Sequence, residues 1–148
     1  MKIHELGHVV LYVRDLERSR HFYRDVLGFT EISAMGTSAA AYSSGRTHHE
    51  LLLIHVGDQA QPIPAGRRVG MYHFGMKVGT TDDELRTALV ELEKAQVKVV
   101  GSSDHGVTHS LYIEDPDGNE VELYIDVQPE IWRENPAAFA SPIKALRL

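Results

Sequence analysis

The chain has no cysteine, no long apolar run and no cluster of basic residues, and each absence excludes a class of protein. Without cysteine there are no disulfides, thiolate metal sites or thiol nucleophiles, so a bound metal would rest on His, Asp, Glu or Tyr. No apolar stretch approaches the roughly twenty residues of a membrane span. The net charge of -6 argues against a nucleic acid partner, because binding phosphates requires a basic face. The N-terminus lacks the apolar core of a signal peptide, which makes the cytoplasm the expected location.

What remains is the composition of one globular domain. The 148 residues are 43% hydrophobic and 24% charged, which is typical of a globular chain with a sizeable core. Histidine is unusually frequent, with nine residues spread along the sequence. Histidine is also the commonest metal ligand among side chains, so these nine residues include candidate metal ligands.

The second half of the chain repeats the first at an offset of 65 residues. His8 opens the apolar run 8–13, and His73 opens the equivalent run 73–78. A helical pattern follows each run. The repeat predicts two copies of one supersecondary unit, neither of which closes a core alone.

Capping signals mark the two helices. The first has an N-cap at Asp15 and stops at Gly28, a residue suited to the left-handed position after a helix. The second opens with Thr81 and Glu84, which have the spacing of a capping box. Both helices carry apolar residues at helical spacing, so each is expected to bury one face.

Three strand-like runs follow each helix. They are residues 29–33, 39–43 and 49–56 in the first half and 97–100, 109–114 and 120–124 in the second. The fold class is therefore α+β, with two tandem βαβββ modules forming one curved mixed sheet with the helices outside. The single domain divides into a first module (3–56), a linker (57–70), a second module (71–127) and a C-terminal tail (128–148). The tail is expected to pack over the domain or over a neighbouring subunit.

Two longer phrases carry a family resemblance. The first resembles the first helix of the vicinal oxygen chelate superfamily and reads Leu-Glu-Arg-Ser-Arg-His-Phe-Tyr-Arg-Asp-Val-Leu-Gly-Phe29. The second resembles the closing hairpin of that superfamily and reads Asp115-Pro-Asp-Gly-Asn-Glu-Val-Glu122. This superfamily includes glyoxalase I, type I extradiol dioxygenases, epimerases, fosfomycin-modifying enzymes and metal-free bleomycin-binding proteins. The resemblance spans about residues 3 to 126 and implies a central metal cleft.

The candidate metal ligands are His8, His73 and Glu122. Two imidazoles and one carboxylate hold non-haem Fe(II) while leaving coordination positions open. His8 and His73 occupy equivalent positions in the repeat, and a carboxylate in the buried strand around Glu122 needs a partner such as a metal. Glu120 has the same parity as Glu122 but lies nearer the turn, and we expect it to face solvent.

The resemblance is greatest to single-domain enzymes of the catechol 2,3-dioxygenase type, and it implies three further site residues. The segment Arg46-Thr-His-His49 resembles the one that supplies an acid-base histidine, here His49. The segment 104–108 resembles the one that supplies a second active-site histidine, His105, and Tyr112 has the spacing of a tyrosine that hydrogen-bonds the substrate. The implied substrates are a small catechol-type aromatic diol and O2, and the implied assembly is a homodimer or a higher homo-oligomer.

His49 and its neighbour Glu50 separate two enzymatic interpretations. Alternation along the strand leaves open which of the two faces the cleft, because both faces of the run look apolar. If Glu50 faces it, the site resembles the four-ligand site of bacterial glyoxalase I, with nickel, zinc or manganese in place of iron. A metal-free small-molecule-binding protein is the third alternative. The presence of His105 and Tyr112 favours the dioxygenase.

Overall fold

The computed structural model describes residues 1–148 and divides into two compact units, Met1–Ile63 and Pro64–Leu148. Their boundary lies inside the segment 57–70, which the sequence indicated as a linker. Each unit builds its own four-stranded sheet. None of the helices combines the length and apolar character needed to cross a bilayer.

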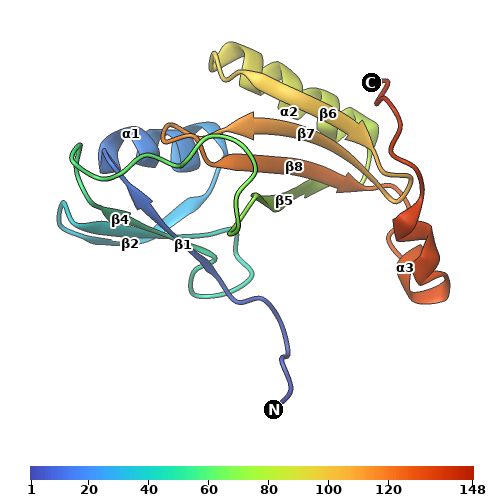
Figure 1. Cartoon of the computed structure of the whole chain (residues 1–148), viewed down its shortest axis with the longest axis horizontal. Coiled ribbons are helices and arrows are strands. Elements are labelled where there is room, and N and C mark those ends of the chain that lie inside the picture. The colour runs from blue at the N-terminus through green and yellow to red at the C-terminus, as the bar shows by residue number, and fades with distance from the viewer. The chain divides into compact units, whose positions relative to one another are not determined.

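The first unit is a mixed sheet with one helical segment. Its elements are β1 (Val9–Val13), α1 (Leu16–Arg20), η1 (His21–Val26), β2 (Thr30–Met35), β3 (Ala39–Ser43) and β4 (Leu51–His55). The strand order is β1-β4-β3-β2, in which β1 runs parallel to β4 and the other neighbours are antiparallel (Figure 1). Alternate residues of β1 and β4 are buried, since one face of the sheet packs on α1.

The helical segment begins and ends as the sequence predicts, but its second half is wider than an α-helix. The Asp15 side chain accepts a hydrogen bond of 3.0 Å from the backbone N–H of Arg18, which confirms the N-cap. Gly28 has a φ of 78°, which confirms the left-handed position after the helix. Residues 21–26 form a π-helical turn, closed by a hydrogen bond from Leu27 N to the carbonyl of Phe22.

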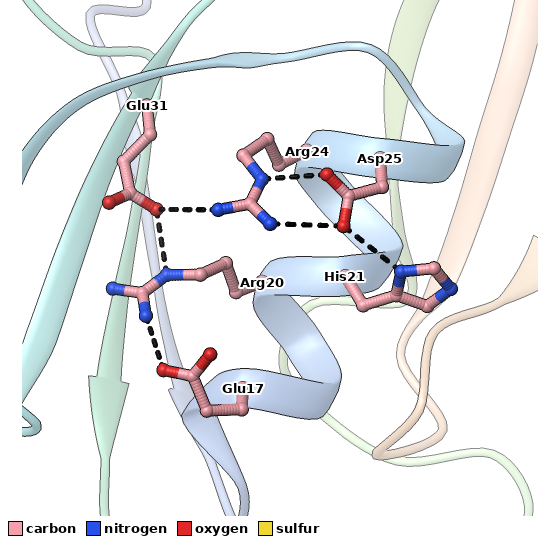
Figure 2. A network of polar contacts seen from close by, with 6 residues as sticks. All are labelled: Glu17, Arg20, His21, Arg24, Asp25 and Glu31. Carbon is pink, nitrogen blue, oxygen red and sulfur yellow. Dashed lines mark hydrogen bonds and ion pairs between the residues drawn. The ribbon is translucent and has the colours of Figure 1, made fainter.

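A network of ion pairs joins residues of this segment to one another and to Glu31 of β2 (Figure 2). Arg20 donates a 2.7 Å hydrogen bond to Glu31 of β2, which ties the helix to the strand. Arg24 donates two hydrogen bonds to Asp25, and His21 lies 3.0 Å from the same carboxylate. These hydrogen bonds, from Arg24 above all, lower the pKa of Asp25 to about 2.

The second unit repeats the topology of the first. Its elements are β5 (His73–Gly79), α2 (Asp82–Lys94), β6 (Val99–Asp104), β7 (Thr108–Glu114), β8 (Glu120–Asp126), α3 (Ile131–Glu134) and the short 3₁₀ helix η2 (Pro136–Ala140). The strand order is β5-β8-β7-β6, with β5 parallel to β8. Both units therefore have the βαβββ arrangement that the repeat predicted, and the α+β class is confirmed.

Helix α2 covers one face of the second sheet. The Thr81 hydroxyl accepts from Glu84 N, and the Glu84 carboxylate accepts from Thr80 N and Thr81 N, so the predicted capping box is present. Leu85 and Leu92 are buried where α2 packs on β5, β7 and β8. This packing leaves the opposite face of the sheet for polar side chains.

Strand β6 differs from the prediction, which had placed it at 97–100. It runs from Val99 to Asp104, and its pairing with β7 shifts between Val99 and Gly101. It is an edge strand, and its polar Gly-Ser-Ser stretch lacks the apolar alternation by which strands are found in a sequence. The longer strand carries the chain directly to His105.

Candidate functional site

The polar face of the second sheet brings together four of the predicted site residues. His73 is the first residue of β5, and Glu122 lies on β8. Tyr112 of β7 is paired with Glu122 in the antiparallel register, so both side chains project from the same face. His105 lies in the turn between β6 and β7.

Their polar atoms form a continuous chain of contacts. His73 Nε2 is 3.4 Å from Glu122 Oε2, and the Tyr112 hydroxyl donates to Glu122 Oε1 at 3.3 Å. His105 Nε2 is 2.8 Å from the Tyr112 hydroxyl. Because that hydroxyl has one proton and donates it to Glu122, His105 serves as the donor to Tyr112.

We expected Glu120 to face solvent because it lies near the turn, but its side chain is only partly exposed and contacts His73. Its Oε1 lies 3.2 Å from His73 Nδ1, and its side chain is 24% exposed. The parallel register of β5 and β8 sets His73 beside Glu120, which is why the two meet. The Glu120 carboxylate on Nδ1 orients the imidazole ring, so that Nε2 lies on the side of Glu122. The equal parity of Glu120 and Glu122 indicated that they share a face of the sheet, but it did not identify His73 as the partner of Glu120.

Glycines flank the Glu122–Tyr112 pair on both neighbouring strands, a feature that the sequence reasoning missed. Gly75 of β5 is in register with Glu122, and Gly101 of β6 is in register with Tyr112. A Cβ at Gly75 would lie 3.3 Å from Glu122 Oε2, and one at Gly101 would lie 3.4 Å from the Tyr112 ring. The two glycines thus leave room for the carboxylate and the phenol to lie across the face of the sheet.

Burial also keeps the tyrosine protonated. The pKa of Tyr112 is raised, first because the phenol is withdrawn from water and second because the negative charge of Glu122 lies beside it. At neutral pH Tyr112 is therefore a hydrogen-bond donor rather than a phenolate. It can orient an anionic or partly charged oxygen bound nearby.

In the first unit His8 lies against His49. Their ring centroids are 4.5 Å apart, and His8 immediately precedes β1. His49 also contacts His48, with 2.6 Å between the two Nδ1 atoms. Withdrawal from water and the positive charges that His48 and His8 can carry lower the pKa of His49, so its ring favours the neutral form.

Glu50 is held in a separate local network. Its carboxylate accepts hydrogen bonds from Ser44 N at 2.6 Å, from Ser44 Oγ at 2.7 Å and from Arg46 Nε at 3.1 Å. Arg46 in turn donates to the carbonyl of Gly7 at 2.8 Å. The pKa of Glu50 is lowered: burial would raise it, but the hydrogen bonds from Ser44 and the charge of Arg46 outweigh that effect.

The chemistry of these groups fits a metal, although neither unit by itself gathers three His, Asp or Glu side chains in a metal-binding arrangement. Two ligands held about 2.1 Å from one ion would lie about 3.0–3.4 Å apart, and His73 Nε2 and Glu122 Oε2 lie 3.4 Å apart. The other polar atom of each group has its own partner: His73 Nδ1 contacts Glu120, and Glu122 Oε1 accepts a hydrogen bond from Tyr112. The second unit therefore has two side chains, His73 and Glu122, whose spacing and neighbouring contacts are compatible with binding one metal ion.

Comparison with known proteins identifies the family. The sequence profile of the Glyoxalase/Bleomycin resistance protein/Dioxygenase superfamily matches residues 5–123. The chain belongs to this superfamily. A glyoxalase/dioxygenase from Nostoc punctiforme has the same fold, with a TM-score of 0.70 at 20% identity over 84% of this chain and 92% of that protein.

Two curated relatives are dioxygenases by name. The catechol-2,3-dioxygenase of Bacillus subtilis (strain 168) is 34% identical over 88% of this chain and 46% of its own length. Biphenyl-2,3-diol 1,2-dioxygenase 2 of Rhodococcus globerulus is 32% identical over 82% of this chain and 63% of its own length. The chain thus matches between about half and two-thirds of the length of these relatives.

Proposed function

We propose that this protein is an Fe(II)-dependent extradiol dioxygenase that cleaves the ring of a catechol-type aromatic diol with O2. The observation that carries the proposal is the convergence of His73, Glu122, Tyr112 and His105 on one face of the second sheet. These contacts connect an imidazole and a carboxylate, two kinds of metal-binding group, with the Tyr112 hydroxyl as a hydrogen-bond donor. The similarity to catechol-2,3-dioxygenase supports the same reaction class.

In this proposal His8 of the first unit completes the metal site with His73 and Glu122. The two histidines open equivalent strands of two units with the same strand order, which supports equivalent roles. Iron held by two imidazoles and a carboxylate supplies open coordination positions at which a diol and O2 can react. The proposed ligand set contains no sulfur, in keeping with the absence of cysteine from the chain.

The remaining residues would handle protons and orientation. His49 would accept a proton from the diol at Nε2, because its Nδ1 is engaged by His48 and its lowered pKa favours the neutral ring. Tyr112, which stays protonated, would turn its one proton from Glu122 to a substrate oxygen when the substrate binds. His105 would hold the Tyr112 hydroxyl in place through their 2.8 Å contact.

The environment of Glu50 supports the dioxygenase over the glyoxalase alternative. A glyoxalase-type site would need this carboxylate as a fourth ligand for nickel, zinc or manganese. Glu50 instead accepts three hydrogen bonds from Ser44 and Arg46 and is paired with the arginine charge. Binding a metal would require breaking these bonds, whereas His49 already lies beside His8. A metal-free binding protein would not need the paired ligands of the second unit.

The experiment that tests the proposal is turnover by protein purified and reconstituted without oxygen. With Fe(II), catechol and O2 we expect a yellow ring-opened product and the uptake of about one O2 per diol consumed. His73→Ala, loaded in the same way, is the matched control and should be inactive because one proposed ligand is missing. If nickel rather than iron supports turnover, and the substrate is a glutathione hemithioacetal, the glyoxalase alternative is correct instead.

A further inference from the structure

The turn that carries His105 is short and is held from within by two hydrogen bonds. The His105 N–H donates to the carbonyl of Thr108 at 2.9 Å, and the Gly106 N–H donates to the Asp104 carboxylate at 2.7 Å. Gly106 has a φ of 80°, which allows the chain to reverse there. Asp104 pairs with His109 of β7, and Val127 N donates to the Val107 carbonyl at 3.0 Å, so the inner side of the turn is tied to the sheet. Its outer side lies at the edge strand β6 and is left to other contacts.

The C-terminal tail, residues 128–148, provides those contacts on both sides of His105. Lys144 pairs with Asp104 as in an antiparallel sheet: Asp104 N donates to the Lys144 carbonyl at 3.0 Å, and Lys144 N donates to the Asp104 carbonyl at 2.9 Å. Ser141 lies over Gly106, where an added Cβ would be 3.6 Å from the Ser141 Cβ. Figure 1 shows the tail leaving β8, turning through α3 and returning past the end of β6.

The tail does not form part of the hydrophobic core. None of its residues is buried, and the aromatic side chains of Trp132 and Phe139 are 55% and 77% exposed. Burial of apolar surface therefore contributes little to holding it in place. The backbone pairing between Lys144 and Asp104 is its one strand-type contact with the sheet. That contact falls on the residue next to His105.

We propose that the C-terminal tail is a positioning element, which acts through Lys144 and Ser141 to hold His105 in contact with Tyr112. The catalytic part of this inference rests on the proposed function, in which Tyr112 orients the substrate. A histidine in a turn at a sheet edge loses its place when the neighbouring residues move. Anchoring residues 104 and 106 keeps the 2.8 Å contact between His105 Nε2 and the Tyr112 hydroxyl.

The test uses the full chain, a chain ending at Ile143, and the substitutions Lys144→Pro and Lys144→Ala. Ending at Ile143 removes both backbone bonds to Asp104, and proline removes the Lys144 N–H alone. Lys144→Ala keeps the backbone bonds and is the matched control. In metal-free protein we expect the nuclear Overhauser contact between the His105 and Tyr112 rings to persist in Lys144→Ala and to disappear in the shortened chain. Its undiminished persistence in the shortened chain would overturn the proposal.

Kinetics in a His105→Gln background separate positioning from general stability. We expect Lys144→Pro to lower kcat by about tenfold, as for the loss of one well-placed hydrogen bond, with a smaller change in KM. In the His105→Gln chain the same proline should have no further effect, because the two changes act through one side chain. Equal losses in both backgrounds would overturn the proposal. If the protein cleaves no diol at all, the proposed function fails, while the ring-contact measurement still decides the role of the tail.

Discussion

The adjacent residues His49 and Glu50 provide the sharpest division between the two enzymatic interpretations. We consider His49→Gln and Glu50→Gln, two substitutions that each keep a polar side chain of similar size. His49 contacts His8 and is proposed to move the proton of the diol, whereas Glu50 is bound by Ser44 and Arg46. The first substitution should therefore affect turnover, and the second should affect stability.

The two substitutions should differ in the size of their effect and in the property that changes. His49→Gln should retain iron but lower the rate of ring cleavage by roughly 10²–10⁴-fold, the usual contribution of a positioned proton-transfer group. Glu50→Gln loses the ion pair with Arg46 and weakens the bonds from Ser44, at a cost of about 1–2 kcal/mol in the free energy of unfolding. For a chain of this size that cost lowers Tm by roughly 3–6 °C.

Three assays on the same preparations decide the outcome. Metal analysis gives the iron content, a catechol assay gives the rate of formation of the yellow product, and thermal unfolding gives Tm. The dioxygenase interpretation is refuted if Glu50→Gln loses the metal while His49→Gln leaves the rate of ring cleavage nearly unchanged. That result would place Glu50 on the metal and assign the chain to the glyoxalase class.

Three further predictions concern a supporting carboxylate, an ion pair and the assembly. Glu120→Gln should weaken metal binding by about 10–100-fold while leaving the fold intact, because its carboxylate supports His73; unchanged affinity in a competition titration would argue against that role. Asp25 has a pKa of about 2 in the folded state and about 3.9 in the unfolded state, so its charge stabilises the fold at pH 7, and this stabilisation is lost as the pH falls from about 4 to 2. Asp25→Asn should therefore lower the free energy of unfolding, measured with urea, at pH 7 but not at pH 2. The exposed aromatic residues of the tail, Trp132 and Phe139, lead us to expect a homodimer or higher oligomer, and only monomer in sedimentation at micromolar concentration would contradict this.

Local signals predicted the framework of the fold well. The N-cap at Asp15, the capping box at Thr81 and the glycine after the first helix all depend on neighbouring residues, and the structure confirms each of them. The structure also has a tight turn at 115–118, where Gly118 N donates to the Asp115 carbonyl at 3.0 Å. Features of this kind can be predicted because residues close in sequence determine them.

The features that the sequence did not predict depend on pairing between distant strands. Glu120 contacts His73 because of the β5–β8 register, and no local pattern sets that register. The position of Gly75 beside Glu122 has the same origin. The choice between His49 and Glu50 remained open in the sequence because it depends on where Arg46 donates its hydrogen bonds. Periodicity places residues on a face, but it does not identify their partners across the sheet.

The proposed function depends on the binding of one iron by His8, His73 and Glu122. The measurement that tests it most directly is the iron content of the wild-type chain, His8→Ala and His73→Ala, each purified and loaded with Fe(II) without oxygen. We predict about one iron per chain in the wild type and its loss in both variants, with circular dichroism showing that the fold is retained. Wild-type iron content in His8→Ala would contradict the claim, because the metal would then not depend on the first unit.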